Sequence, residues 1–176
     1  QNQDSLERNQ DLIFQNQELN SYLKYTTHRL FDSENDSVVR KLRECGLDNS
    51  EASMVKVLFV PSYLNGADGV FNEEYFDFLQ AFDLTVFPSY YEPWGYTPME
   101  SAAFHVPCVT TDLAGFGLWA NSLKGDTSEI EDGVKTIHRS DYNFDEVSDG
   151  IRDTILKFTQ FDKKQVNAAR KNAAKV

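Results

Sequence analysis

The sequence predicts an α/β protein built on a parallel sheet, and two features lead to this class. Short runs rich in Val, Leu, Thr and Ile alternate along the chain with longer segments of helical periodicity. That alternation is typical of strands joined by crossover helices. The runs VKVLFV and LTVF are also apolar almost throughout, as expected for strands that are buried on both faces. We therefore expect a Rossmann-like, doubly wound parallel sheet.

Four runs are the expected strands. The first two, Val55–Val60 and Leu84–Phe87, each end at a proline, which the middle of a sheet excludes. The other two are Cys108–Thr111 and Val134–His138, and a shorter strand is expected at Tyr25–His28.

Helical segments separate these runs. Residues 4–24 carry apolar side chains at helical spacing, and Asp36 or Ser37 is positioned to cap a helix that ends at Gly46. For Gly115 and Gly117, in the stretch AGFG, a tight turn and a role in shaping a cleft are equally good explanations. The further expected helices are about Glu73–Ala81 with Asn72 as its cap, one that starts near Pro98, Phe144–Phe161 and Lys163–Lys175.

Composition narrows the function classes. The 176 residues include 17 Lys and Arg against 28 Asp and Glu, a net charge of −11, which argues against a nucleic-acid partner. No apolar run approaches the ~20 residues of a membrane span, and the polar first ten residues do not form a signal peptide. Cys45 and Cys108 lie far apart and suggest no disulfide framework, so the expected location is the cytoplasm. The polar start at Gln1 suggests a fragment of a longer protein.

The segment FPSYYEPWGYTPMES, residues 87–101, follows an expected strand and opens an expected helix. Ligands of such sheets bind at the carboxyl ends of the strands. Thr97 is the expected N-cap, Pro98 the first helical residue and Glu100 the third, which is the spacing of a capping box. The free N–H groups and the dipole at this helix start would suit a phosphate.

The sequence around this segment has no positively charged side chains. No Lys or Arg occurs between Lys56 and Lys124, so a diphosphate here would receive only N–H groups from this stretch. Either no phosphate binds, or the cations come from another part of the protein. Glu92 and Glu100 form the pattern E-x7-E, and two carboxylates can accept hydrogen bonds from sugar hydroxyls. A capping role alone would also explain Glu100.

The strings FPSYYEPWGYTPMES and PCVTTDLAGFG resemble glycogen synthases of the animal, fungal and Bacteroidetes type. Weaker resemblance extends upstream, so that it runs from about Thr26 to Gly117. It implies the C-terminal, sugar-nucleotide-binding lobe of a two-domain GT-B glycosyltransferase. We therefore expect residues 1–176 to form a single domain, a fragment that is inactive without the absent N-terminal lobe.

The same resemblance implies the reaction. Such enzymes transfer glucose from UDP-glucose to the non-reducing end of glycogen, an α-1,4-glucan, with retention, and they need neither a metal nor a bound cofactor. The expected partners are UDP-glucose, the glucan and the protein's own N-terminal lobe. Two alternatives remain: a transferase that uses another donor such as ADP-glucose, and a non-catalytic nucleotide- or glucan-binding module.

The resemblance also implies the site residues. Glu92 would lie near the anomeric centre of the donor glucose, and Glu100 would hold the ribose hydroxyls. The turn around the glucose and diphosphate would consist of Trp94, Gly95, Tyr96 and Thr97, and Tyr63 and Tyr75 would sandwich the uracil ring. The family's basic pair for the diphosphate lies upstream of this chain. The three histidines, His28, His105 and His138, are too scattered in the sequence to suggest a metal site.

Overall fold

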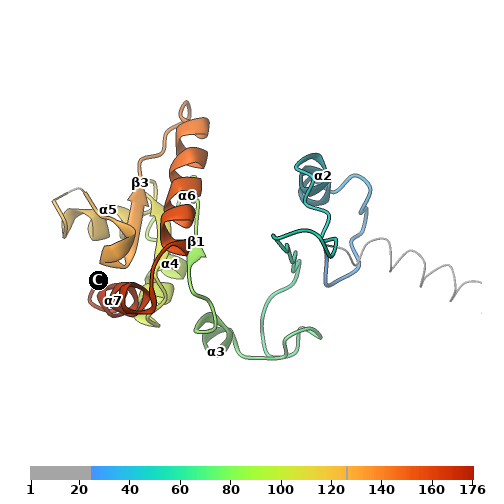
Figure 1. Ribbon diagram of the computed structural model, residues 1–176, viewed down its shortest axis with the longest axis horizontal. Helices are drawn as coiled ribbons and strands as arrows, with labels where there is room; N and C mark the ends of the chain where they lie inside the picture. Colours follow the sequence, from blue (N-terminus) through green and yellow to red (C-terminus); the bar gives the residue numbers. More distant parts are fainter. Residues whose placement is uncertain (1–24, 126) are drawn as a thin grey trace, which may run out of the picture. The chain divides into compact units, whose positions relative to one another are not determined.

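The computed structural model describes residues 25–125 and 127–176, so the helix expected over residues 4–24 lies outside the described residues. The chain divides into two units, residues 1–72 and 73–176, and each is considered by itself (Figure 1). The single domain expected over residues 1–176 stays a prediction. No helix in the described part of the chain combines the length and apolar character needed to cross a membrane.

The described part of the first unit contains one helix, α2 (Ser37–Glu44), as the sequence predicts. The Asp36 carboxylate caps it by accepting hydrogen bonds from Val38 N at 2.9 Å and Val39 N at 3.0 Å. Beyond the helix, Gly46 has a φ of +68°, a left-handed conformation that glycine adopts without strain.

The buried strand expected at Val55–Val60 is wrong. The run makes only an isolated parallel bridge, between Thr26 and Phe59, and Val55 and Leu58 are 56% and 58% exposed. The side chain of Asn49 takes the place of a neighbouring strand. It donates to Val57 O at 2.7 Å and accepts from Val57 N at 2.8 Å, so backbone groups that a ladder would pair are satisfied locally.

The second unit contains the parallel sheet that the sequence predicts. Its strands are β1 (Thr85–Val86), β2 (Cys108–Thr111) and β3 (Val134–Ile137), in the order β1-β2-β3. Three of the expected strands are therefore confirmed, although β1 is shorter than its apolar run. Backbone bonds from Thr85 N to Pro107 O at 3.0 Å and from Phe87 N to Val109 O at 2.8 Å join it to β2.

The helices of this unit are α3 (Tyr75–Leu79), α4 (Tyr96–Ala103), α5 (Gly115–Ser122), α6 (Phe144–Thr159) and α7 (Lys163–Ala173), with a short 3-10 helix η1 (Ile130–Asp132). The last two α-helices confirm the expected C-terminal helices. Helix α3 is shorter than expected and Asn72 does not cap it, because the Asn72 side chain accepts from Gly69 N at 2.9 Å instead. Helix α5 occupies the AGFG stretch, so the tight turn considered there is wrong.

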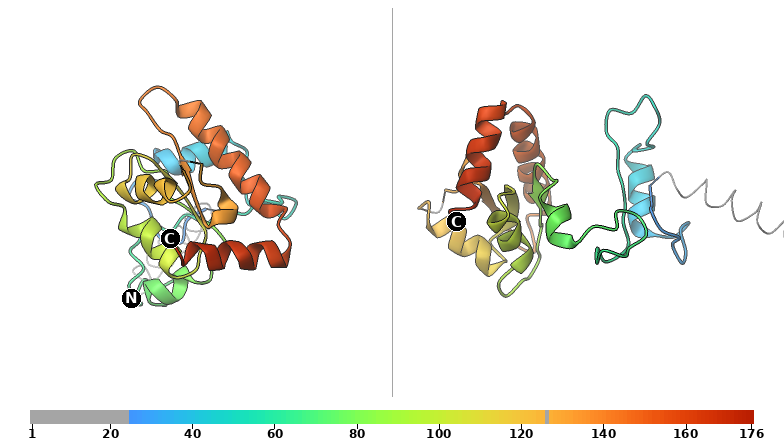
Figure 2. Two further views of the ribbon diagram at one scale, coloured as in Figure 1. Left: turned by 90° about the vertical axis from the view of Figure 1, so that its left-hand side faces the viewer. Right: turned by 90° about the horizontal axis from the view of Figure 1, so that it is seen from below.

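Helices cover both faces of the sheet, which confirms the doubly wound architecture. Cys108 belongs to a buried cluster with Phe116 of α5 and Ala102 of α4. Its neighbour Val109 faces the opposite way and packs with Val147 of α6. In Figure 1, β3 lies between α5 and α6. Helix α7 turns sharply from the end of α6 and contributes to both clusters (Figure 2).

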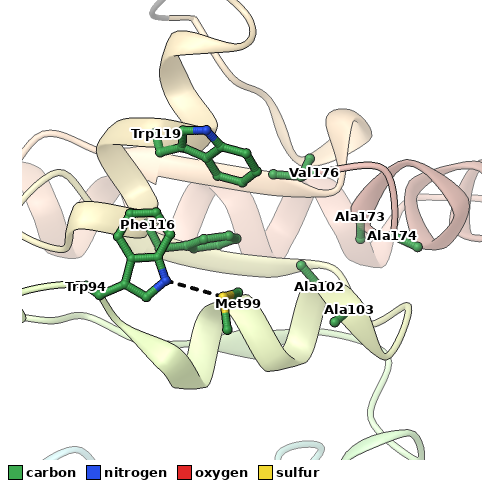
Figure 3. A pocket seen from close by; sticks show the side chains of 9 residues that line it. All are labelled: Trp94, Met99, Ala102, Ala103, Phe116, Trp119, Ala173, Ala174 and Val176. Carbon is green, nitrogen blue, oxygen red and sulfur yellow. Dashed lines mark hydrogen bonds between the residues drawn. The ribbon is translucent and has the colours of Figure 1, made fainter.

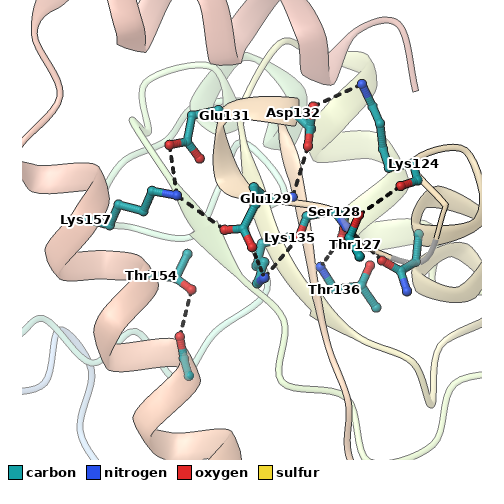
Figure 4. Close-up of polar contacts among 12 residues, drawn as sticks. Lys124, Thr127, Ser128, Glu129, Glu131, Asp132, Lys135, Thr136, Thr154 and Lys157 are labelled. Carbon is teal, nitrogen blue, oxygen red and sulfur yellow. Dashed lines mark hydrogen bonds and ion pairs between the residues drawn. The ribbon is translucent and has the colours of Figure 1, made fainter.

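A network of charges ties η1 to β3 and α6 (Figure 4). Glu129 pairs with Lys135 at 2.9 Å and with Lys157 at 3.3 Å, and Lys157 also pairs with Glu131 at 2.8 Å. The hydrogen bond from Lys135, with smaller contributions from Lys157, lowers the pKa of Glu129. Asp132 has a lowered pKa as well, since bonds from the backbone of Glu129 and from Lys124 outweigh its partial burial.

These carboxylates make the stability of the protein depend on pH. A carboxylate with a lowered pKa in the folded state stabilises the fold above its unfolded pKa, and this contribution disappears as the pH falls through the folded pKa. We expect the free energy of unfolding to fall below about pH 5, by less than ~1 kcal/mol for each exposed pair. Lys157→Met should weaken the acid dependence in urea unfolding, and Lys164→Met, at an exposed lysine of α7, is the control. An equal acid dependence in both variants would contradict this assignment.

A second prediction concerns the contact between α5 and β2. A Cβ atom at Gly117 would lie 2.1 Å from Thr111 O, a backbone atom that cannot move aside. Gly117→Ala should therefore lower the free energy of unfolding by about 1–3 kcal/mol. The control is Gly150→Ala in α6, whose nearest atom would be Ile137 Cδ1 at 3.5 Å; it should gain about 0.5–1 kcal/mol. Urea unfolding of the three proteins checks both, and similar stabilities would refute the close contact.

Candidate functional site

Three loops leave the carboxyl ends of the parallel strands and meet at one edge of the sheet. They are residues 87–95 after β1, residues 112–114 after β2 and residues 138–143 after β3. Ligands of open α/β sheets bind at this edge. The first loop carries Glu92 and leads into α4, so the segment singled out from the sequence lies where a ligand site is expected.

Backbone hydrogen bonds fix the position of Glu92. Its N–H donates to Leu113 O at 3.1 Å, and its carbonyl accepts from Gly115 N at 3.3 Å. Two residues on, Trp94 O accepts from Phe116 N at 2.6 Å. The Glu92 side chain itself is exposed. The loop is thus fastened through its main chain, and the carboxylate remains available to a ligand.

The close approach of this loop to α5 requires a glycine. A Cβ atom at Gly115 would lie 2.5 Å from Pro93 O and 3.2 Å from a ring carbon of Trp94. Both glycines of the AGFG stretch thus serve close packing at the start of a helix: Gly115 admits the loop, and Gly117 admits the end of β2.

The capping box expected at the start of α4 is wrong. The helix begins at Tyr96 with Gly95 as its N-cap, and no side chain caps it. Gly95 has a φ of +94°, and this left-handed conformation turns the chain into the helix before Thr97 is reached. Pro98 is then the third helical residue, where its missing N–H still costs no intrahelical bond.

This early start determines which amide groups face the sheet edge. The first intrahelical hydrogen bond runs from Met99 N to Gly95 O at 3.4 Å. The N–H groups of Gly95, Tyr96 and Thr97 precede it, and the partial positive charge of a helix N-terminus is concentrated on such groups. They can therefore bind an anion.

Tyr75 and Glu100 are brought near each other although 24 residues separate them in the sequence. Partial burial, followed by the negative charge of the nearby Glu100 carboxylate, raises the pKa of Tyr75. The phenol therefore stays neutral. Packing of α3 supports the pair, since Phe76 stacks on Phe104 at the end of α4 with ring centroids 4.9 Å apart.

The side chain of Trp94 takes part in packing. Its Nε1 donates to Met99 Sδ at 3.3 Å, and its ring lies 6.2 Å from those of both Phe116 and Trp119. Figure 3 shows these residues around an apolar pocket of about 290 Å³ between α4, α5 and the C-terminal end of α7. The backbone of Trp94 thus belongs to the turn at the sheet edge, while its side chain lines this pocket.

The other predicted binding residues differ in exposure. Tyr96 is 65% exposed at the start of α4. Tyr63 belongs to the first unit and is 91% exposed, beside a hollow formed with Pro61 and Ser62. Its part in uracil binding stays a prediction.

The histidine and cysteine side chains lie apart from this sheet-edge segment or are occupied, with the exposed Cys45 in the first unit. The described residues contain no group of three or more His, Cys, Asp or Glu side chains arranged to hold a metal ion. His28 is occupied by Thr27 and by the Asp68 carbonyl, each at 2.8 Å. Burial raises the pKa of the Cys108 thiol to about 12, so this cysteine is not a nucleophile at neutral pH.

The loop after β3 contributes residues that sequence reasoning missed. Arg139 donates from Nη1 to Pro88 O at 2.6 Å and lies 4.7 Å from the centroid of the Tyr90 ring. Tyr90 donates to Asp141, and this bond raises its pKa. A signal was available: Arg139 and Asp141 directly follow a predicted strand, at the same sheet edge as Glu92.

Comparisons with known proteins bear on the family of this chain. The sequence profile of a family described as glycogen synthase matches residues 2–176. The chain is 36% identical over 140 residues to glycogen [starch] synthase isoform 2 of Saccharomyces cerevisiae, covering 79% of this chain and 20% of that protein. For the Neurospora crassa glycogen [starch] synthase the identity is 34% over 139 residues, and these cover 79% and 19% of the two chains.

A mammalian relative matches to the same extent. The identity to the liver glycogen [starch] synthase of Mus musculus is 33% over 140 residues, covering 80% of this chain and 20% of that protein. The chain thus spans about a fifth of the length of these curated relatives. With a profile match over nearly all of its residues, the chain belongs to the glycogen synthase family.

Proposed function

We propose that this chain is the donor-binding part of a retaining glucosyltransferase that extends an α-1,4-glucan from UDP-glucose. The observation that carries the proposal is the placement of Glu92 and the start of α4 at one edge of the sheet, with Glu100 farther along that helix, in a chain of the glycogen synthase family. The relatives named above are called glycogen [starch] synthases, which supports the same activity for this protein.

The nucleotide end of the donor would lie against α3 and α4. Tyr75 would stack on the uracil ring, and the part of Tyr63 in uracil binding stays a prediction of the family resemblance. Glu100 lies near Tyr75, and its carboxylate oxygens have lone pairs for a ribose diol. Because the two side chains lie near each other, binding of the base and of the ribose would be coupled.

The reacting end would lie at the start of α4. The N–H groups of Gly95, Tyr96 and Thr97 would hold the diphosphate and stabilise it as it leaves. Glu92 would face the donor glucose, where its charge stabilises the cationic character that develops at the anomeric carbon. We assign Glu92 no covalent role. No metal or cofactor enters this proposal, and the protein's own N-terminal lobe would supply the remaining cations and the acceptor.

The cysteines fit a cytoplasmic location. Cys45 is exposed, Cys108 is buried, and neither forms a disulfide. Unpaired cysteines are usual in reducing compartments. We therefore propose that the protein works in the cytoplasm.

Nucleotide preference distinguishes this proposal from an ADP-glucose enzyme. We expect calorimetric titration of the full-length protein to give tighter binding of UDP than of ADP. Tyr75→Ala should lower UDP affinity about five- to a hundredfold, because base stacking on an aromatic ring contributes ~1–3 kcal/mol. Leu156→Ala, at a residue of α6 that is 53% exposed and outside the three site loops, is the control. Equal binding of both nucleotides, or unchanged affinity in Tyr75→Ala, would refute the uridine site.

Turnover distinguishes an enzyme from a binding module. Glu92→Gln keeps the size of the side chain and removes its charge, so kcat for transfer from UDP-glucose should fall about 10²- to 10³-fold. Glu146→Gln, at an exposed residue in the first turn of α6, should leave kcat unchanged. Wild-type turnover in Glu92→Gln would exclude Glu92 from the reaction, and an inactive wild type would favour the binding module.

A further inference from the structure

We propose that Arg139 is a positioning residue that holds the loop carrying Glu92 against the end of the sheet. The effect on catalysis rests on the function proposed above; the structural effect does not. The sequence only places Arg139 after a predicted strand, and its contacts assign it this role.

Arg139 and Asp141 hold the loop at two neighbouring points. The guanidinium donates to the Pro88 carbonyl at 2.6 Å and lies over the Tyr90 ring at 4.7 Å from its centroid. The Tyr90 hydroxyl in turn donates to the Asp141 carboxylate. A cation over an aromatic face contributes about 0.5–1 kcal/mol at an exposed site, in addition to the hydrogen bond. The segment from Pro88 to Tyr90 is thus held from the β3 side.

Arg139 is itself firmly placed. Asp112, directly after β2, accepts from Arg139 N through Oδ1 at 2.9 Å, and its Oδ2 lies 2.6 Å from His138 Nδ1. Asp112 N also donates to Ile137 O at 3.1 Å, which extends the pairing of β2 with β3. The backbone of Arg139 is therefore tied to the sheet, so its side chain can transmit a fixed position to the loop.

On the β2 side, the segment before Glu92 is held through its main-chain atoms. Ser89 O accepts from Thr111 Oγ1 at 2.7 Å, and the next such hydrogen bond along the chain runs from Glu92 N to Leu113 O at 3.1 Å. Between these points lie Tyr90 and Tyr91, which are 53% and 79% exposed. Without Arg139, the segment before Glu92 would keep its hydrogen bonds on the β2 side and lose the contacts that Arg139 makes on the β3 side.

The orientation of the guanidinium argues for positioning rather than for anion binding. Arg139 takes part in none of the ion pairs among the described residues, and its resolved contacts are a carbonyl and a ring. Arg places a planar group over Tyr90 while donating to Pro88, whereas Lys can donate but cannot stack in the same way. A lysine should therefore restore part of the function.

The test uses Arg139→Met and Arg139→Lys in the full-length protein. We expect Arg139→Met to lower kcat about 10- to 100-fold with KM for UDP-glucose changed less than about threefold, since a small displacement of a reacting group costs rate. Hydrogen exchange of the amides from Ser89 to Trp94 should become faster while α6 and α7 keep their protection. Arg139→Lys should lie between this variant and the wild type. The control is Arg152→Met, at an arginine of α6 paired with Asp149 and Asp153.

Each outcome of this test either supports or overturns the role proposed for Arg139. Unchanged exchange in Arg139→Met overturns the proposal, whether or not the wild type transfers glucose. Faster exchange with kcat within twofold of the wild type also overturns it, because the contact would then be structural only. A loss confined to KM would indicate direct donor binding and contradict positioning. An inactive wild type with faster exchange in the variant refutes the proposed function while supporting the contact.

Discussion

The close approach of α5 to the ends of two chain segments is the constraint on which the site depends. Where Gly115 and Gly117 lie, side-chain atoms would meet the carbonyls of Pro93 and Thr111 at 2.5 Å and 2.1 Å. Because both positions lack a Cβ atom, the first turn of α5 can cover the sheet and bind the Glu92 loop through its backbone at once. A helix displaced outward by even an ångström would lose the bonds to Glu92 and Trp94.

In the loop that results, backbone and side chains serve different purposes. Trp94 places its indole in the apolar packing with Met99 and Phe116, while its carbonyl is bonded to α5. One residue later, the positive φ of Gly95 starts α4 early and leaves three amide groups ahead of the first intrahelical bond. Apolar burial on one side of the loop thus stabilises a polar surface on the other.

Much of the fold could be predicted because its strands and terminal helices carry strong periodic signals. Strands β2 and β3 and helices α6 and α7 agree with the apolar pattern. Helix α5 was missed because its sequence, GFGLWANS, begins with two glycines of low helix propensity, and packing against β2 overrides that propensity. The run at Val55–Val60 failed for the opposite reason: its pattern is strand-like, but a side chain, Asn49, bonds its backbone.

The candidate site was predictable only in part, for a related reason. The segment from Glu92 to Thr97 was identified by its residues, yet the start of α4 was misplaced, because T-x-x-E satisfies a capping pattern that the conformation of Gly95 makes unnecessary. The only sequence signal of Arg139 is its position directly after a predicted strand. Its contact with Pro88 joins residues 51 positions apart, and only the meeting of strand ends at one edge brings them together.

Under the function proposed above, binding and reaction would have physically separate supports. Glu100 lies within α4 near Tyr75 of α3, whereas Glu92 lies in a loop held by α5 and by the segment after β3. A disturbance of the α3–α4 packing would then act first on the nucleotide end, and one at Arg139 or Gly115 first on the reacting end. Because the two carboxylates do not share their supports, affinity and turnover could vary independently in this protein.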